Sequence, residues 1–205
     1  AVVDDVLART GDDLRLGGER KVVTVMFSDI RGFTTFSEKH APEQVIDILN
    51  QYLSIMSDVV LEHGGTLIAY MGDGIMAVFG APADLPDHAD RAVAAAEQMT
   101  GPALERFNAM LRERGDEPFR IGVGLNSGPV MAGNVGSTRR MEYTTIGDTT
   151  NTASRLESMT KGSGHSIFLS ESVRAMLTLP RDDLVHVAEM QVRGRDEPVT
   201  VWSVT

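Results

Sequence analysis

The stretch Val22–Thr34, VVTVMFSDIRGFT, decides how the fold of this chain is to be interpreted. Residues 21–28 form a nearly continuous apolar run, which is typical of a strand that is buried on both faces. The run then meets the carboxylate of Asp29. Because a buried charge is costly unless it is paired, Asp29 is expected to face a binding partner at the end of this strand.

The composition indicates one domain with a short appendage and a sizeable core, because the 205 residues are 42% hydrophobic and 23% charged. The formal net charge of −10 argues against a nucleic-acid or anionic-membrane partner, since such partners are bound by basic surfaces. A polyanionic ligand therefore needs positive charge supplied locally. The lack of cysteine excludes a disulfide framework and a cysteine metal site, and it is compatible with a reducing compartment.

The N-terminal residues are expected to connect the domain to an upstream region. Residues 1–20 are polar and interrupted by glycines, so we expect a short helix and a linker there and the folded domain over residues 21–205. No run reaches the roughly 18–20 apolar residues that span a membrane, and no signal peptide opens the chain. Because the chain begins at Ala1, we expect a cytoplasmic part of a longer protein that can be membrane-attached elsewhere.

The rest of the chain alternates strand and helix patterns. A helix is expected from Pro42 to His63, because apolar residues recur there at intervals of three and four. Residues 66–80 indicate a hairpin around Gly72-Asp73-Gly74, since an Asp-Gly pair tolerates positive φ. Further strands are expected over 119–128, 128–136, 139–148 and 166–170 and twice within 184–204, and further helices over 87–114 (interrupted near Gly101-Pro102), 148–160 and 170–178.

This order of elements predicts an α/β fold, in the form of an α+β sandwich rather than an all-β fold. The initial order β-α-β-β-α-β matches a ferredoxin-like core, to which further strands and helices are added at the C-terminal end. In such a core the first strand and the hairpin lie side by side. The carboxylates of Asp29 and Asp73 are therefore expected to converge.

Two converging carboxylates need a cation or a proton between them. At about 4 Å their repulsion is roughly 4 kcal/mol at an effective dielectric constant near 20. Two oxygen ligands beside a phosphate suit Mg²⁺ or Mn²⁺, which commonly take one or two carboxylates and complete their shell with phosphates and water. The alternative interpretation is that Asp29 merely caps a helix and that Asp73 merely occupies the hairpin turn.

Two further segments carry polar groups suited to a nucleotide. In the strand-to-helix turn IRGFT, the backbone N–H groups of Gly32, Phe33 and Thr34 are expected to face a triphosphate. In TTIGDTTNTASRLE, Asn151 and Arg155 are four residues apart and share one helix face, where they can orient a ribose and a phosphoryl oxygen. Taken alone, the second pattern equally describes a surface helix whose arginine pairs with a carboxylate.

Four sequence blocks together resemble the catalytic domain of class III nucleotide cyclases, the adenylate/guanylate cyclase family. The blocks are VTVMFSDIRGFT, GGTLIAYMGDGIMAVFG, RIGVGLNSGPVMAGNVG and YTTIGDTTNTASRLE. The resemblance covers roughly Glu19 to Val204, and the motifs are long and jointly specific. It implies the class III cyclase fold, and it implies that residues 1–20 are a linker from an upstream sensor or membrane region.

The resemblance also implies a reaction and a set of roles. ATP or GTP is cyclised to a 3′,5′-cyclic monophosphate with release of pyrophosphate, when the ribose 3′-oxygen attacks the α-phosphorus. Asp29 and Asp73, with the carbonyl of Ile30, match the ligands of two Mg²⁺ or Mn²⁺ ions. Asn151 matches the residue that positions the ribose, and Arg155 matches the one that stabilises the charged phosphate in the transition state.

Further implications concern the phosphates and the assembly. Arg120 and Arg195 fall where the family places basic residues that contact phosphate, although ordinary surface salt bridges would explain them equally well. In the family the metal ligands and the Asn/Arg pair come from opposite subunits. A chain that carries both sets is therefore expected to form a head-to-tail homodimer with two sites.

The resemblance breaks at the residues that select the base. Ala69 stands where adenylate cyclases of this type carry Lys, and Thr144 stands at the partner position, as in the Lys–Thr subtype. Losing one charged donor removes about 1.5–3 kcal/mol of discrimination, or roughly 10- to 100-fold. ATP remains the expected substrate, because Thr144 and backbone groups can read adenine and no Glu is present to hold guanine. The alternative is that a neighbouring side chain replaces the missing Lys.

Three functions follow in order of preference. The first is an adenylate cyclase, because Asp29, Asp73, Asn151 and Arg155 are all retained. The second is a guanylate or mixed-specificity cyclase, which Ala69 favours. The third is a non-catalytic regulatory module that binds nucleotide, for which loss of one of the four retained residues would be typical. The related diguanylate cyclases are disfavoured, because MGDGIM stands where their Gly-Gly-Asp/Glu-Glu-Phe hairpin belongs.

Overall fold

A computed structural model of the chain describes residues 16–137, 139–191 and 197–204. The described strands form one eight-stranded sheet in the order β2-β3-β1-β4-β6-β8-β7, with β5 paired to β4. The strands are β1 (Gly17–Ile30), β2 (Thr66–Met71), β3 (Gly74–Phe79), β4 (Ile121–Ser137), β5 (Arg140–Ile146), β6 (Ile167–Ser170), β7 (Leu184–Met190) and β8 (Val199–Val204). The helices are α2 (Phe33–Lys39), α3 (Pro42–Glu62), α4 (His88–Gln98), η1 (Met99–Ala103), α5 (Leu104–Glu113), α6 (Asp148–Met159) and α7 (Glu171–Ala175).

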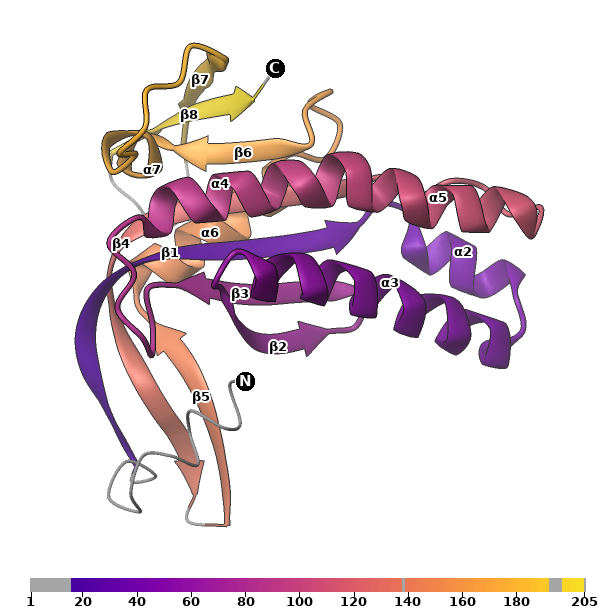
Figure 1. Ribbon diagram of the computed structural model, residues 1–205, viewed down its shortest axis with the longest axis horizontal. Coiled ribbons are helices and arrows are strands. Elements are labelled where there is room, and N and C mark those ends of the chain that lie inside the picture. The colour runs from indigo at the N-terminus through magenta and orange to yellow at the C-terminus, as the bar shows by residue number, and fades with distance from the viewer. Residues whose placement is uncertain (1–15, 138, 192–196, 205) are drawn as a thin grey trace.

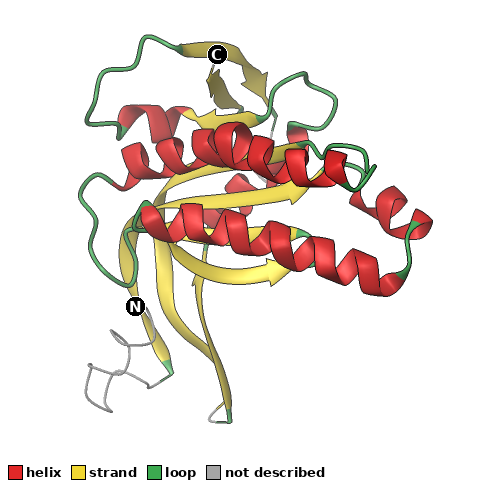
Figure 2. Cartoon of the chain, turned by 45° about the vertical axis from the view of Figure 1, so that its right-hand side comes forward, coloured by secondary structure: helices red, strands yellow, loops and turns green. Residues whose placement is uncertain are grey.

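The predicted ferredoxin-like core is confirmed. Its elements follow in the order β1-α3-β2-β3-α4-β4, and its four strands lie in the order β2-β3-β1-β4. Helices α3, α4 and α5 cover one face of the sheet, and α6 packs on the other (Figure 1; Figure 2). The added C-terminal elements extend the sheet beyond β4, because β6 pairs with β4 in parallel and β8 and β7 follow.

Strand β1 is largely apolar and buried on both faces from Val23 to Phe27, whereas its first residues are exposed. Val23, Val25 and Phe27 point to the cluster that includes α6, whereas Met26 and Ile30 point to the cluster under α3 and α4. The strand begins four residues before the expected start at residue 21, and Gly17 already pairs with β4. Residues 1–15 lie outside the described residues, so their role as a linker stays a prediction.

The prediction of two strands over residues 119–136 was wrong, because β4 is one continuous strand. The glycines that suggested an interruption serve close approach instead. A Cβ at Gly124 would lie 2.2 Å from the backbone nitrogen of Glu157 in α6, and a Cβ at Gly133 would lie 2.0 Å from the carbonyl oxygen of Gly17. Helix α6 and strand β1 therefore approach the backbone of β4 at positions that carry no side chain.

An arm projects from the sheet, made of residues 17–22 of β1, 131–137 of β4 and 140–146 of β5 (Figure 1). It lies beyond the layer of helices that covers the core (Figure 1). Large apolar side chains are exposed on it, namely Val22, Met131, Val135, Met141 and Ile146. By their register, Val22, Met131, Val135 and Ile146 share one face of the arm. Because monomeric proteins rarely gather such residues on one surface, this face is a candidate contact surface.

The helices follow the expected ranges, with α2 as an addition and with the predicted interruption near Gly101-Pro102 confirmed. Helix α2 is separate from α3, and the long helical stretch over residues 87–114 is broken where Gly101 leaves helical geometry with φ −109° and ψ −106° beside Pro102. Removal of one backbone donor by the proline explains the break. Among the described residues, no helix combines the length and the apolar character that crossing a bilayer demands.

Candidate active site

The pairing of β1 with β3 brings Asp29 and Asp73 together. Ser28 pairs with Ile75 at the end of the two strands, so the hairpin turn lies beside Asp29. The backbone N–H of Ile30 donates to Asp73 Oδ2 at 3.1 Å. The predicted hairpin is confirmed, and the positive φ of its turn belongs to Gly72, at 65°, rather than to the Asp-Gly pair.

The two carboxylates repel each other in a half-buried position. Burial, followed by hydrogen bonding to Asp73 and the negative charges of Asp73 and Glu157, raises the pKa of Asp29 to about 7. The alternative that Asp29 caps a helix is not supported, because Gly32 is the N-cap of α2 and no side chain caps that helix. The acidic pair is thus short of positive charge.

The donor set fits a hard divalent cation. Asp29, Asp73 and the Ile30 carbonyl offer only oxygen, and oxygen ligands are what Mg²⁺ and Mn²⁺ prefer. Within the described residues, no cluster of three or more His, Cys, Asp or Glu side chains exists, so a closed protein cage of such side chains is not found. Tyr52 lies beneath the pair, where burial and the charges of both aspartates raise the pKa of its phenol and keep it neutral.

The turn after Asp29 is open on its outer side. Gly32 has φ 77°, which favours glycine, and a Cβ placed there would meet nothing within 4 Å. Thr34 is exposed, whereas Phe33 is half-buried and stacks on Phe36 at 6.0 Å between ring centroids. The first N–H groups of α2 have no intrahelical acceptor, so the three predicted phosphate-binding positions share one exposed turn.

Helix α6 presents Asn151 and Arg155 outward. Asn151 is exposed and Arg155 is half-exposed, whereas Leu156 and Glu157 are buried. Among the residues that the structure describes, neither the Asn151 nor the Arg155 side chain has a hydrogen-bond or ion-pair partner. The alternative that Arg155 pairs with a surface carboxylate therefore finds no support in this part of the chain.

The other predicted phosphate contacts are placed unequally. Arg120 is exposed, and its carbonyl accepts a hydrogen bond from the Arg31 N–H at 2.7 Å, so it lies beside the turn that follows Asp29. Its side chain pairs with no carboxylate in the described ranges, which disfavours the surface salt bridge. Arg195 lies outside the described residues.

The two base-selecting positions are not brought together within one chain. Ala69 is exposed on β2, next to an irregularity in the pairing with β3. Thr144 is half-buried on β5, opposite Gly133 of β4. Strands β3, β1 and β4 lie between them in the sheet.

Sequence reasoning missed one charged pair close to these residues. Arg31 Nη2 lies 2.8 Å from Glu157 Oε1, so the motif after β1 is joined to α6. Both residues were quoted within the sequence blocks, but nothing in their local pattern indicated that they meet. The only signal was that Arg31 follows the end of a buried strand and that Glu157 lies on the buried face of a helix, where a charged side chain needs a partner.

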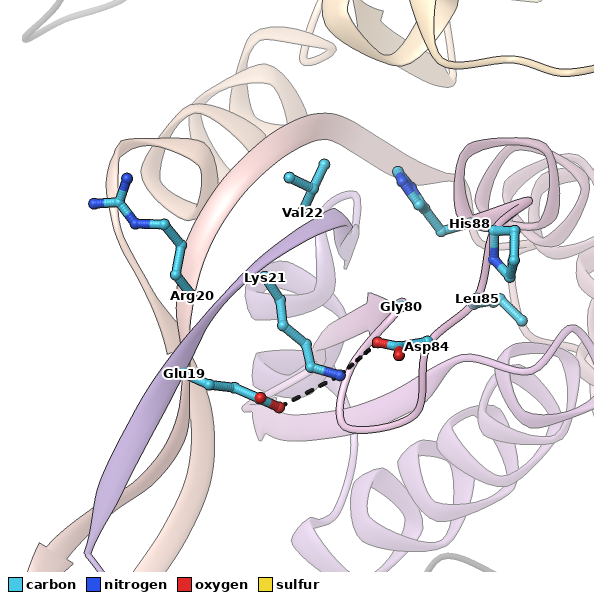
Figure 3. A pocket seen from close by; sticks show the side chains of 9 residues that line it. Glu19, Arg20, Lys21, Val22, Gly80, Asp84, Leu85 and His88 are labelled. Carbon is cyan, nitrogen blue, oxygen red and sulfur yellow. Dashed lines mark hydrogen bonds and ion pairs between the residues drawn. The ribbon is translucent and has the colours of Figure 1, made fainter.

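Two cavities lie away from this group of residues. The first, of about 510 Å³, lies where the N-terminal half of β1 faces the loop after β3 (Figure 3). There Lys21 Nζ pairs with Asp84 at 2.7 Å and with Glu19 at 3.4 Å. The second, of about 460 Å³, lies between β4 and the N-terminal end of α6. Neither cavity is lined by the two aspartates or by the Asn/Arg pair of α6.

Comparison with known families decides what this arrangement represents. The family model described as Adenylate and Guanylate cyclase catalytic domain matches residues 18–204. The chain belongs to this class III cyclase family. Adenylate cyclase 1 of Rhizobium meliloti is 43% identical to this cyclase domain over 191 residues, which are 90% of the chain and 28% of that protein.

Other relatives agree with this assignment. The adenylate cyclase of Anabaena cylindrica is 36% identical over 188 residues, 89% of this cyclase domain and 36% of that protein. The chain thus spans about a third of the length of these curated relatives. The similarity therefore concerns the cyclase domain alone.

Solved cyclase structures share the fold. The guanylyl cyclase Cya2 has a TM-score of 0.84 at 39% identity, covering 92% of this chain and 94% of that chain. The adenylyl cyclase CyaB from P. aeruginosa has a TM-score of 0.84 at 34% identity, covering 93% and 96%. One of these structures is named a guanylyl cyclase and the other an adenylyl cyclase. Similarity to them therefore supports the cyclase class of this chain but does not indicate which base it prefers.

Proposed function

We propose that this cyclase domain converts ATP to 3′,5′-cyclic AMP and pyrophosphate at the interface of a head-to-tail homodimer. One observation carries the proposal. The carboxylates of Asp29 and Asp73 converge at the end of β1 and share an uncompensated negative charge, while the same chain presents Asn151 and Arg155 without partners on α6. Membership of the class III family supports this division of roles.

The residues of the chain then have distinct tasks. Asp29, Asp73 and the Ile30 carbonyl would hold two Mg²⁺ or Mn²⁺ ions. When bound, these ions supply positive charge at the phosphates and favour the ionised 3′-oxygen. Asn151 orients the ribose so that this oxygen lies in line with the α-phosphorus, and Arg155 donates hydrogen bonds to the phosphoryl oxygens as charge develops.

The phosphates receive further donors from the same chain. The exposed N–H groups of Gly32, Phe33 and Thr34 face the β- and γ-phosphates in this proposal, because the first turn of α2 leaves them without acceptors. Arg120 contributes charge from the adjacent turn, and Arg195 keeps the role that the resemblance implies. These donors supply the positive charge that the net charge of −10 lacks.

The homodimer is proposed because the family resemblance assigns the two residue sets to opposite subunits, and because β3, β1 and β4 lie between Ala69 on β2 and Thr144 on β5. The partner's α6 supplies the Asn/Arg pair to the Asp29–Asp73 pair of the first subunit. The exposed apolar side chains of the arm, among them Met131 and Ile146, which pair across β4 and β5, support such an interface. An upstream sensor or membrane region, a linker role for the N-terminal residues and a cytoplasmic location stay predictions.

The substrate is tested by measuring ATP and GTP turnover side by side, with Mg²⁺ and with Mn²⁺. We expect cyclic AMP to be the main product, because Thr144 and backbone groups can read adenine and no Glu holds guanine. A guanylate or mixed-specificity cyclase is the second candidate, since Ala69 lacks the charged donor of adenylate cyclases. Equal or higher turnover of GTP would favour that candidate and overturn the choice of ATP.

The shared site is tested by mixing two inactive chains. Asp73→Ala removes a metal ligand and Arg155→Ala removes the transition-state donor. A mixed dimer retains one intact site, so random mixing should restore roughly a quarter of the wild-type activity. If neither the wild-type chain nor the mixture forms a cyclic product, while nucleotide still binds, the chain is the regulatory module that remains the third possibility.

A further inference from the structure

Arg31 follows Asp29 by two residues, yet its side chain leads away from the aspartates to another element. Its Nη2 donates to the Glu157 carbonyl at 3.0 Å and forms an ion pair with Glu157 Oε1 at 2.8 Å. The same nitrogen donates to the hydroxyl of Thr160. Arg31 therefore holds the C-terminal end of α6 through three oxygen atoms, across the width of β4.

Glycines in β4 make room for this connection. Gly122 pairs with Asp29 across the two strands, and a Cβ there would lie 1.5 Å from Arg31 Nη2 and 2.3 Å from Thr160 Oγ1. Two residues further along, a Cβ at Gly124 would collide with the backbone of Glu157. The guanidinium and the helix thus occupy the space that two side chains would otherwise fill.

The contact is enclosed and its chemistry is complementary. The side chains of Arg31 and Glu157 are only 18% and 10% exposed. A guanidinium at the C-terminal end of a helix satisfies carbonyls that lack intrahelical donors and interacts favourably with the helix dipole. The Arg31 backbone is fixed as well, since its N–H donates to the Arg120 carbonyl.

We propose that Arg31 and Glu157 are positioning residues that fix α6, and with it Asn151 and Arg155, relative to the Asp29–Asp73 pair of the same chain. The inference rests on the proposed function. In a head-to-tail dimer these two sets serve different sites. The ion pair therefore links the two active sites through the body of each subunit.

The test uses a mixed dimer with one working site. One chain carries Arg155→Ala and supplies the metal ligands, and the other carries Asp73→Ala and supplies α6. Arg31→Met and Glu157→Met are then added to the second chain, whose own metal ligands are not used. We expect kcat of the working site to fall roughly 3- to 30-fold, as for other residues that couple sites, with little change in the KM for ATP.

The double substitution separates positioning from stability. Replacing both partners with methionine keeps the volume and leaves no buried charge unpaired, a change that is often neutral for stability. Thermal unfolding and dimer mass are measured on each mixture. Should the double variant fail to fold, Glu157→Gln in the same chain keeps the shape and an acceptor oxygen, and a smaller fall in kcat is expected.

A matched ion pair elsewhere serves as the control. Arg181 has a side chain that is 19% exposed and pairs with Glu97 at 2.7 Å. It lies just before β7, and Glu97 lies on α4. Arg181→Met in the second chain is expected to lower the unfolding midpoint and to leave kcat of the working site unchanged.

Three results would overturn the inference. An unchanged kcat shows that α6 does not depend on the ion pair. A fall seen only when the substitutions are in the chain that supplies the metal ligands shows that Arg31 acts locally on Asp29. If the parent mixed dimer makes no cyclic nucleotide, the shared site of the proposed function fails first, and the link between sites fails with it.

Discussion

The two halves of the candidate site differ in how far the fold prepares them. Asp29 and Asp73 are half-buried, and Asp73 accepts a hydrogen bond from the Ile30 N–H. Asn151 and Arg155 project from α6 without partners among the described residues. One half is therefore fixed by strand pairing, and the other is left open on a helix surface.

The difference indicates how the two halves of the proposed site depend on the scaffold to different degrees. Acidic groups must be held together by the scaffold, because they repel each other until a cation is bound. Donor groups on α6 need no such support, since water solvates them until a phosphate arrives. The same asymmetry predicts that substitutions in the two halves change the rate of cyclisation and the stability by different amounts.

The largest effect is expected from Asp73→Ala. Loss of a metal ligand should lower the rate of cyclisation by roughly 10³-fold or more, as for other essential catalytic groups. Stability should change little, because losing the hydrogen bond from Ile30 is offset by relief of the repulsion with Asp29. Product formation with Mn²⁺ and ATP, and the thermal unfolding midpoint, check both expectations.

Asp58→Ala is the matched control for that variant, because Asp58 is exposed on α3. It should leave the rate unchanged. A normal rate for Asp73→Ala would remove the basis of the metal half of the site.

Arg155→Ala is expected to have the next largest effect. It should lower kcat by roughly 10²- to 10³-fold, because one transition-state donor is lost. The unfolding free energy should stay within about 0.5 kcal/mol of wild type, since the side chain makes no contact with a charged partner in the described chain. Arg106→Ala, on the exposed surface of α5, is the control. A large loss of stability in Arg155→Ala would show that this half is structural after all.

Ala69→Lys tests how the base of the nucleotide is selected. A lysine at this exposed position of β2 should raise the ratio of ATP to GTP turnover roughly 10- to 100-fold by adding a charged donor. Initial rates with the two nucleotides measure the ratio directly. No change in this ratio would mean that the lysine position was aligned in the wrong register.

The smallest effect concerns His40, which ties the end of α2 to the C-terminal side of α5. His40 Nδ1 faces the Phe36 carbonyl at 2.8 Å and Nε2 faces Asp116 Oδ1 at 2.9 Å, so both nitrogens donate only in the charged form. These two contacts, the carbonyl first, raise the pKa of His40, although the nearby Lys39 opposes the shift.

A raised folded-state pKa fixes the sign of the pH dependence. The stabilisation is fully present below the unfolded value near pH 6.5 and is lost as pH rises through the folded value. The unfolding midpoint should therefore decline more steeply above about pH 6.5 in the wild type than in His40→Gln. Thermal scans between about pH 5.5 and 8.5 measure the slopes, and identical slopes would contradict this role of His40.

Local patterns were sufficient to predict the part of the fold that holds the aspartates. The apolar run of β1 and the turn at Gly72 each depend on a few adjacent residues, and the order of elements then brings Asp29 and Asp73 together. The prediction of two strands over residues 119–136 failed for a physical reason. Glycine within a strand indicates either a break or the close approach of another backbone, and only the folded structure shows that α6 approaches Gly124.

The link between Arg31 and α6 could not be predicted from the sequence. Arg31 and Glu157 are 126 positions apart, and neither lies in a pattern that requires the other. Side-chain contacts over such distances depend on how a helix rests on the sheet, which periodicity does not determine. The spacing of Asn151 and Arg155 placed them on one helix face but equally described a surface helix, so their catalytic roles were predicted only from the resemblance of their block to a known family.

The continuous pairing of β1 has a consequence for how a segment joined to Gly17 could act on this domain. Every residue from Gly17 to Ile30 has a partner on β4. Sliding the strand by one residue would turn Asp29 to the opposite face and exchange the side chains that pack in the two buried clusters, Val23, Val25 and Phe27 on one face and Met26 and Ile30 on the other. Pulling or pushing at Gly17 is therefore expected to move the subunit as a whole, and in the proposed homodimer this movement would change the alignment of one protomer against its neighbour and leave each interior intact.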